Sequence, residues 1–233
     1  MSIFVVPQNH NSNNTTTAMI SVVDHYLPYD THNLYDVTFN SETIHTLLTS
    51  DPSMVDSWIS DILRLYRQHI IVGLDVEWRP NTQRNMDNPV ATLQLCVGRR
   101  CLIFQIIHAP SIPNSLMSFL RNTNHTFMGV GIHEDVEKLL VDYNLGVTNM
   151  VDLRTLAADV YGDPEMRRTG LKTLARRVLE TEVEKPERIR RGRWDNMWLT
   201  AEQVQYACVD AFLSFEIGRI LRPNGVTFSY YTH

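Results

Sequence analysis

Two carboxylates interrupt an otherwise apolar run, VGLDVEW, at residues 72–78. Residues two apart on a β-strand point to the same side, so Asp75 and Glu77 are predicted to project together. Neighbouring carboxylates repel each other and stay ionised only beside a neutralising cation. Oxygen ligands suit Mg²⁺ or Mn²⁺, so the pair indicates a divalent metal site. The alternative is that both acids lie in solvent at the strand end or pair with Arg79 or Arg84.

Two further acids stand where they could complete such a site. The glycines of GVGIHEDVEKLL allow a tight crossing from strand to helix, and Asp135 follows in the first helical turn. A carboxylate is also common there without a metal, because a helix N-terminus favours negative charge. Near the C-terminus, Tyr206 and Asp210 are four residues apart and share one helical face. Taken alone, that pair indicates only a hydrogen bond at the edge of the core.

Taken together, these motifs resemble the DEDD 3′–5′ exonucleases of the subclass with a tyrosine. Their order is Asp-x-Glu on a strand, then Gly-x-Gly-x-x-x-Asp, then Tyr-x-x-x-Asp on a late helix. The resemblance runs from Val72 to Leu221 and is closest to the Werner-type branch, through LDVEW, ATLQLCVG, GVGIHEDVEKLL, LKTLARRVL and RWDNMWLTAEQVQYACVDAF. The earlier DVTFNSETIHTLLTSDPSMVDSWI resembles small plant members, including the RISC-interacting clearing exoribonucleases.

This resemblance implies an enzyme that hydrolyses single-stranded RNA or DNA to nucleoside 5′-monophosphates with two Mg²⁺ or Mn²⁺ ions. It implies that Asp75 bridges both ions and that Glu77 and Asp210 hold the ion that makes the nucleophile. Asp135 would hold the other ion, in part through water, and Tyr206 would orient the attacking water. A ribonuclease H-type endonuclease is the alternative enzyme. A non-catalytic nucleic-acid-binding or scaffold protein with the same fold is the alternative outside enzymes.

Basic residues are concentrated between residues 167 and 193. The segment holds ten Lys/Arg and four Glu, a net charge of +6, while the whole chain is −5 and the remainder therefore −11. It is either a solvated surface of mixed charge or a strip that binds phosphates of an entering strand. The candidate phosphate contacts are Arg168, Lys172, Arg176, Arg177, Arg190, Arg191 and Arg193. Trp78, next to the acid pair, would pack beside the terminal nucleotide or in the core.

Strand-like and helix-like segments alternate along the chain, which predicts one α/β domain with a ribonuclease H-like mixed sheet flanked by helices. The domain is expected at residues 19–223, after a disordered tail at 1–18 and before a C-terminal tail at 224–233. Predicted strands are a hairpin at 35–49 and runs at 69–78, 91–98, 101–107 and 126–132. Predicted helices are 51–67, 113–121, 133–144, 170–180 and 200–221, and the segment 149–162 begins as a strand and becomes a helix.

The remaining sequence features bear on location and partners. Three cysteines form no even disulfide framework, no window is apolar enough to cross a bilayer, and the first residues lack a secretory pattern. We therefore expect a protein of the cytoplasm and/or nucleus, with reduced thiols and no membrane association. Nucleic acid is the expected partner. By resemblance, a second copy of the chain and RNA-silencing or DNA-repair proteins are further candidate partners.

Overall fold

The computed structural model describes residues 15–66 and 69–222 of the 233-residue chain. Most of the predicted disordered tail and all of the predicted C-terminal tail lie outside the described residues. Thr16–Thr17, however, form strand β1, which runs parallel to β10 (Thr181–Glu182). The predicted tail was wrong for these two residues, because pairing with a distant segment satisfies their backbone hydrogen bonds and leaves no mark in the local sequence.

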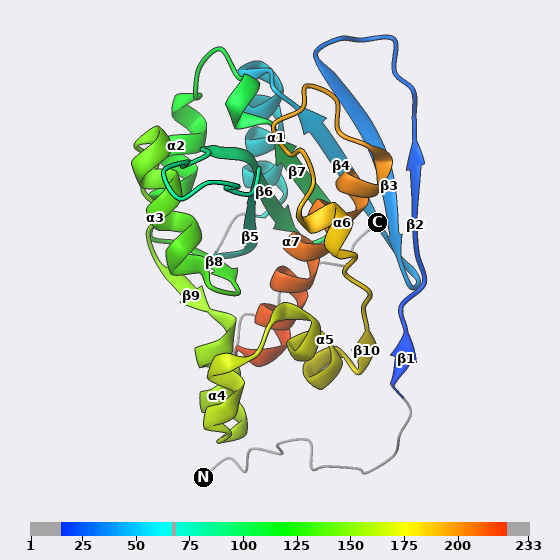
Figure 1. Cartoon of the computed structure of the whole chain (residues 1–233), viewed down its shortest axis with the longest axis vertical. Coiled ribbons are helices and arrows are strands. Elements are labelled where there is room, and N and C mark those ends of the chain that lie inside the picture. Colours follow the sequence, from blue (N-terminus) through cyan, green and yellow to red (C-terminus); the bar gives the residue numbers. More distant parts are fainter. Residues whose placement is uncertain (1–14, 67–68, 223–233) are drawn as a thin grey trace.

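An eight-stranded mixed sheet forms the centre of the molecule (Figure 1). Its strand order is β2-β3-β4-β7-β6-β5-β8-β9, with parallel pairs only at β4/β7, β5/β8 and β8/β9. The predicted hairpin is β3–β4, and the predicted strand 101–107 ends early because a 3₁₀ helix takes over at Ile106–His108. The bounds are β2 Ile20–Asp24, β3 His32–Phe39, β4 Glu42–Thr49, β5 Ile70–Trp78, β6 Val90–Val97, β7 Arg100–Phe104, β8 His125–Gly129 and β9 Met150–Asp152.

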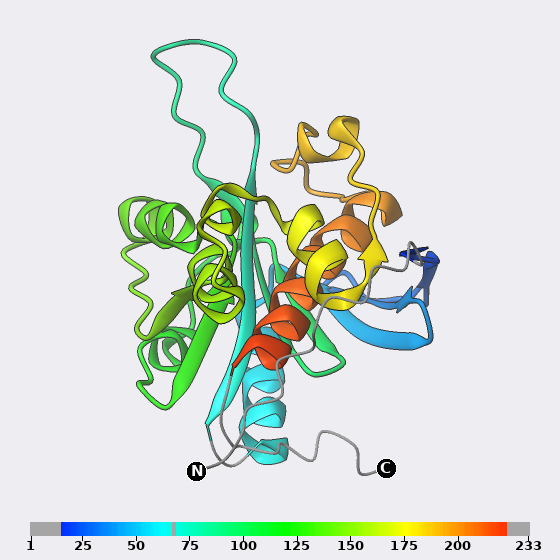
Figure 2. The ribbon, with the colours of Figure 1, turned by 90° about the horizontal axis from the view of Figure 1, so that it is seen from below.

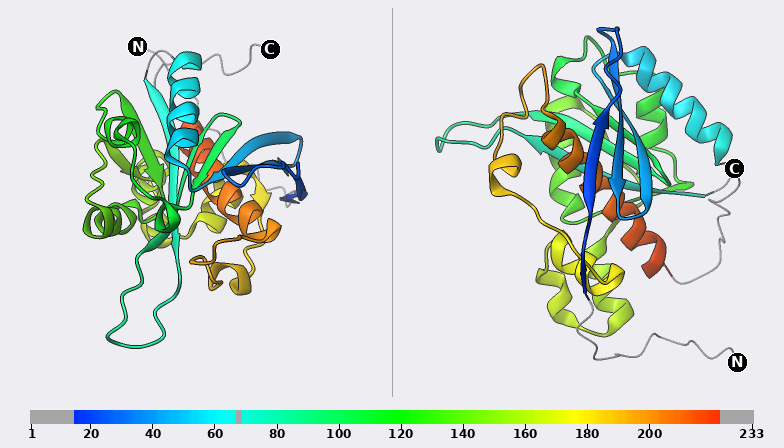
Figure 3. Two further views of the ribbon diagram at one scale, coloured as in Figure 1. Left: turned by 90° about the horizontal axis from the view of Figure 1, so that it is seen from above. Right: turned by 90° about the vertical axis from the view of Figure 1, so that its right-hand side faces the viewer.

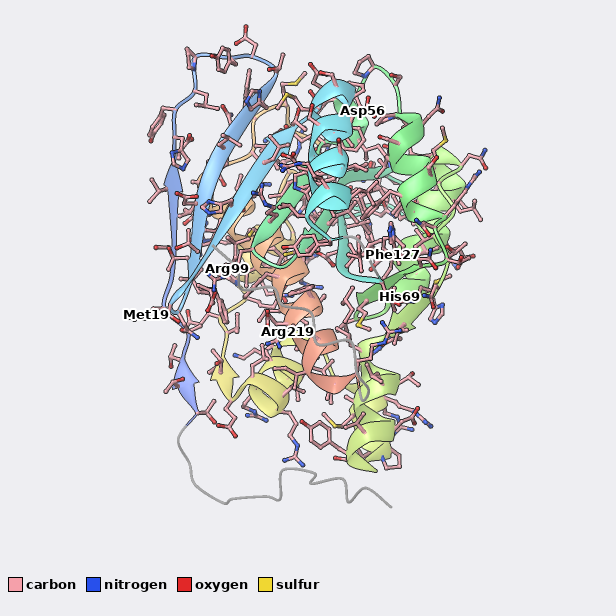
Figure 4. The ribbon with its side chains drawn as sticks, turned by 180° about the vertical axis from the view of Figure 1, so that it is seen from behind. Met19, Asp56, His69, Arg99, Phe127 and Arg219 are labelled. Carbon is pink, nitrogen blue, oxygen red and sulfur yellow. The ribbon has the colours of Figure 1, made fainter. Side chains whose placement is uncertain are left out.

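Helices cover both faces of this sheet, and each face has its own buried apolar cluster. One face carries α1 (Pro52–Leu65), α2 (Asn114–Leu120) and α3 (Ile132–Tyr143). The other carries α4 (Leu153–Tyr161), α5 (Leu171–Leu179), the short α6 (Glu187–Arg190) and α7 (Ala201–Leu221). Seen from behind, α1 lies across its face of the sheet with Asp56 near its upper end (Figure 4). The predicted three-layer arrangement is confirmed.

Strand β5 faces both layers through the alternation of its side chains. Val72, Leu74 and Val76 belong to the cluster under α1, α2 and α3. Asp75 and Glu77 point the opposite way and meet a side chain of α7. The predicted orientation of the two acids is therefore confirmed.

Helix α7 is buried along most of its length, between the sheet and the shorter helices of its layer. It begins with a capping box. The backbone N–H of Gln203 donates to the Thr200 hydroxyl oxygen at 3.2 Å, and the backbone N–H of Thr200 donates to the side-chain oxygen of Gln203 at 3.1 Å. The cap fixes where the helix starts, and so which residues face β5. In the part of the chain that the structure describes, no helix combines the length and apolar character needed to cross a membrane.

Gly73 lets α7 approach β5 unusually closely. A Cβ placed at Gly73 would lie 2.0 Å from the carbonyl oxygen of Ala211 and 2.6 Å from the backbone nitrogen of Phe215. Backbone atoms cannot rotate out of the way, so this contact requires glycine. Gly73 lies two residues before Asp75 on the same face, and Ala211 directly follows Asp210. The same contact therefore sets how near the strand and helix acids come.

We expect Gly73→Ala to lower the free energy of unfolding by about 1–3 kcal/mol, because the added methyl must push α7 away from the strand. Gly170→Ala is the matched control, since nothing lies within 4 Å of a Cβ there and its φ is −94°. Urea unfolding of the two variants makes the comparison. Equal stability of the two would contradict the close contact at Gly73.

Candidate active site

Three carboxylates meet where β5 passes α7. Asp75 and Glu77 from the strand and Asp210 from the helix each place an oxygen within 4.8 Å of the others. Asp210 is 4% exposed, whereas the two strand acids are only partly buried. The group is thus supported by the core on the helix side and reachable from solvent on the strand side. Oxygen donors at this spacing can hold a divalent cation.

The fourth predicted acid, Asp135, lies in the first turn of α3 as expected. It stands outside the group of three, yet its charge helps to raise the pKa of Asp75 and of Glu77. Burial raises the pKa of Asp135 itself to about 7, and the charges of Glu134 and Asp152 add to the rise. The structure therefore brings all four predicted acids into one electrostatic neighbourhood.

Burial and mutual repulsion disfavour ionisation of this neighbourhood. Burial is the largest cause of the raised pKa of Asp75, followed by the charges of Asp210 and Asp135. Burial also raises the pKa of Glu77 first, and Asp75 and Asp210 add to it. The pKa of Asp210 is raised by burial although the adjacent Lys185 opposes the rise. A bound cation would offset these costs, which distinguishes the group from acids in open solvent.

Tyr206 lies one helical turn before Asp210 and contacts the same group. Its hydroxyl helps to lower the pKa of Asp210, against the effect of burial. Burial and the nearby carboxylates raise the pKa of Tyr206, so the phenol stays neutral. Its ring packs against Trp194, with centroids 6.0 Å apart. The ring contact therefore positions Tyr206, while its hydroxyl acts on Asp210.

Lys185 is a member of the site that the sequence did not single out. Its ammonium nitrogen lies 2.5 Å from Oδ2 of Asp210 and 5.1 Å from the ring centroid of Tyr206. Burial works to lower the pKa of Lys185, but the charges of Asp210 and then of the strand acids raise it overall. Lys185 is one of ten basic residues between 167 and 193, and no spacing distinguishes it from the others.

Trp78 lies on the other side of the strand from the acids. It packs against the apolar cluster under α1, α2 and α3, and the ammonium of Lys138 lies 5.6 Å from its ring centroid. A register shift between Glu77 and Trp78 marks the end of regular pairing with β6. This placement favours the core alternative, and its contact with a nucleotide stays a prediction.

The predicted phosphate contacts divide into two groups. Arg190 pairs with Glu187 at 2.9 Å, and its charge also acts on Tyr206 and Glu77. Arg190 is thus an exposed side chain whose charge acts on two residues of the site, Tyr206 and Glu77. The other candidates are also surface side chains. Three of them form ion pairs: Arg193 with Asp195, Lys172 with Glu182 and Arg168 with Glu165. Arg177 lies over the ring of Tyr161, and Arg176 and Arg191 are exposed.

Arg79 does not neutralise the strand acids. It pairs instead with Asp195, at 3.4 Å, and Asp195 also accepts from Arg193 at 2.9 Å. These pairs connect the end of β5 to the segment that precedes α7. The alternative in which Arg79 is the counter-ion of Asp75 and Glu77 is therefore wrong.

A loop at residues 79–89 projects from the molecule directly after the strand acids (Figure 2). The side-chain amide of Asn88 donates to the carbonyl oxygens of Arg79 and Pro80 at 3.0 and 3.3 Å, which ties the base of the loop. Figure 3 shows that the loop and the segment around α6 extend on the same side of the molecule. The loop follows β5 and the α6 segment precedes α7, so both adjoin the elements that carry the three acids.

The fold has a counterpart among solved structures. RNase D of Escherichia coli, an exoribonuclease involved in structured RNA processing, aligns with 75% of this chain and 43% of its own, with a TM-score of 0.63 and 20% identity. At this identity the likeness concerns the fold alone. It confirms the predicted ribonuclease H-like α/β class.

The sequence also matches known proteins. A 3′–5′ exonuclease of Arabidopsis thaliana is 35% identical over 67% of this chain and 54% of its own length. The mouse bifunctional 3′–5′ exonuclease/ATP-dependent helicase WRN is 31% identical over 89% of this chain and 14% of its own. The chain thus spans about half of the first relative and a small part of the second. A family model described as 3′–5′ exonuclease matches residues 54–225, and the chain belongs to that family.

Proposed function

We propose that the protein is a metal-dependent 3′–5′ exonuclease of the DEDD subclass with a tyrosine, of the Werner-type branch. It hydrolyses phosphodiester bonds of single-stranded RNA or DNA and releases nucleoside 5′-monophosphates. The observation that carries this proposal is the meeting of Asp75, Glu77 and Asp210 within 4.8 Å, with the two strand acids only partly buried. Family membership supports it independently.

The donor set fits divalent cations of the Mg²⁺ or Mn²⁺ type. Every candidate ligand is a carboxylate, and burial and mutual repulsion raise the pKa values of these acids, a cost that a bound divalent cation would offset. We infer two ions, because Asp75 interacts with the α7 acid and the α3 acid at once. Bound cations supply a hydroxide at neutral pH and stabilise charge on the phosphoryl and leaving oxygens.

Each residue then has a separate task. Asp75 would serve both ions, Glu77 and Asp210 would hold the ion beside Tyr206, and Asp135 would hold the ion on the α3 side. The Tyr206 hydroxyl stays protonated, so it orients the attacking water and does not remove a proton from it. Tyr206 lies one helical turn before Asp210 and its hydroxyl acts on the pKa of that acid, which supports a position close to the ligands of one ion.

Digestion is expected to require Mg²⁺ or Mn²⁺ and to stop in excess EDTA, because carboxylates alone cannot stabilise the developing charge. The measurement uses 5′-labelled single-stranded RNA, single-stranded DNA and recessed duplex of one sequence. Shortening from the 3′ end with release of mononucleotides identifies the exonuclease. Cleavage of a circular strand would identify an endonuclease, and binding without digestion would identify a scaffold protein. Full activity in EDTA would refute the metal site.

Arg190→Gln is expected to weaken binding of a single strand and to reduce the slope of log affinity against log salt by about 0.7, the value for one phosphate contact. Arg64→Gln is the matched control, because Arg64 pairs with Asp61 in the same i,i+3 geometry but lies on α1, on the other face. Fluorescence anisotropy between low and moderate salt gives both slopes. An unchanged slope for Arg190→Gln would show that Arg190 contacts no phosphate and is only a solvated surface residue.

The wider setting is also part of the proposal. Action in the cytoplasm and/or nucleus, assembly with further copies, and work beside RNA-silencing or DNA-repair proteins rest on the resemblance to Werner-type and small plant exonucleases. The identity to the Arabidopsis and mouse relatives supports this resemblance. Size-exclusion chromatography with light scattering tests the assembly directly.

A further inference from the structure

Lys185 places a fixed positive charge inside the group of carboxylates. Its nitrogen lies 2.5 Å from Oδ2 of Asp210, with 23% of the lysine side chain and 6% of the aspartate side chain exposed. The same charge lowers the pKa of Asp75 and of Glu77 against the effect of burial. One ammonium group thus acts on three predicted metal ligands.

The ammonium group has somewhere to move. A cavity of about 90 Å³ lies beside it, and Lys185, Tyr206 and Asp210 all contribute to the lining. Polar groups of Glu184 and Gln205 line the same space. A lysine side chain is a compact charge on a flexible stem, so it can leave one oxygen for another without backbone movement.

Charge balance indicates when it would move. A divalent cation at Asp210 and the ammonium of Lys185 repel each other and compete for the same carboxylate. Four carboxylates balance two divalent cations, so the lysine is then left without a counter-charge. A phosphodiester brings one negative charge to this place, and its non-bridging oxygens accept hydrogen bonds from an ammonium group.

We propose that Lys185 is an internal counter-ion that competes with the divalent cation at Asp210 and passes to a phosphodiester oxygen once the cation binds. This inference rests on the proposed exonuclease function. It has a consequence that a purely structural ion pair lacks. Removing the charge of Lys185 strengthens cation binding and at the same time weakens hydrolysis.

The test is a Mn²⁺ titration without nucleic acid, in which the electron paramagnetic resonance signal of free Mn²⁺ measures the fraction that is not bound. Lys185→Met is expected to bind Mn²⁺ at least about tenfold more tightly than the wild type, which corresponds to about 1.4 kcal/mol. Lys185→Arg keeps the charge and should stay near the wild type. Lys138→Met is the control for a lysine paired with acids elsewhere, here Asp87 and Asp142, and should leave the affinity unchanged.

Two further measurements complete the comparison. Saturating Mn²⁺ should raise the melting temperature of Lys185→Met more than that of the wild type, because the variant leaves Asp210 without a positively charged partner until the cation binds. Single-turnover digestion by Lys185→Met should be slower. If this variant does not fold, Lys185→Gln replaces it. If the wild type digests the strand but the uncharged variant binds Mn²⁺ equally or more weakly than the wild type, the counter-ion inference is wrong and the exonuclease function stands. If the wild type does not digest the strand but Lys185→Met still binds Mn²⁺ more tightly, the proposed exonuclease function is wrong and the competition between Lys185 and the cation is confirmed.

Discussion

Asp75→Asn is expected to slow digestion by about 10²–10³-fold or more, because removing charge that stabilises a transition state has effects of that size. Asparagine keeps the shape of aspartate but not its charge, so it cannot bridge cations in the same way. Asp75 interacts with both Asp210 and Asp135.

The same substitution is expected to preserve or raise stability when EDTA is present. The pKa of Asp75 is raised by burial and like charges, so the folded state loses stability as the pH rises from the pKa of the unfolded chain to the raised pKa, and the loss persists above it. Asparagine removes that cost at neutral pH. Urea unfolding in EDTA measures the stability, and Asp61→Asn on α1 serves as the control for both measurements. A variant within a few-fold of the wild-type rate would show that Asp75 is not a metal ligand.

Tyr206→Phe is expected to slow the chemical step by about 10²-fold, in the range of other positioned proton-transfer groups. Phenylalanine keeps the ring that packs on Trp194 and removes only the hydroxyl that reaches Asp210. Binding of the strand should persist. Single-turnover digestion with enzyme in excess measures the chemical step, and anisotropy in Ca²⁺ measures binding.

Tyr161→Phe is the matched control for this loss of a hydroxyl. Tyr161 ends α4, and its ring faces the guanidinium group of Arg177, on a different part of the surface. Its rate should equal that of the wild type. A wild-type rate for Tyr206→Phe as well would leave the four carboxylates as the whole catalytic set and make Tyr206 a residue of the core.

The parts of the site that the sequence predicted are those with a local period. Asp75 and Glu77 share a side because side chains alternate on a strand, and Tyr206 and Asp210 share a face because a helix turns every 3.6 residues. The meeting of Asp75 with Asp210 was expected from the resemblance, since no local rule joins residues that distant. The hairpin β3–β4 and the capped helix α7 were predictable from alternation and capping for the same reason.

The missed parts depend on contacts between distant segments. Lys185 reaches Asp210 only because the chain after β10 crosses beside α7, and its neighbours Glu184 and Pro186 give no periodic signal. Strand β1 exists only through its pairing with β10. The sequence alone gives no reason for a glycine at position 73, because its contact with the backbone of α7 appears only in the folded structure.

The contact at Gly73 also bears on which ions the site can use. Main-chain atoms of β5 and α7 touch there, so the separation of the strand and helix acids is set by the backbone and not by the reach of side chains. Mg²⁺ binds oxygens at about 2.0–2.1 Å and Ca²⁺ at about 2.3–2.6 Å. The contact limits how closely the strand and helix can approach, so a larger ion would have to draw α7 away from β5 and lose packing there. The missing Cβ atom of Gly73 thereby favours the smaller ion.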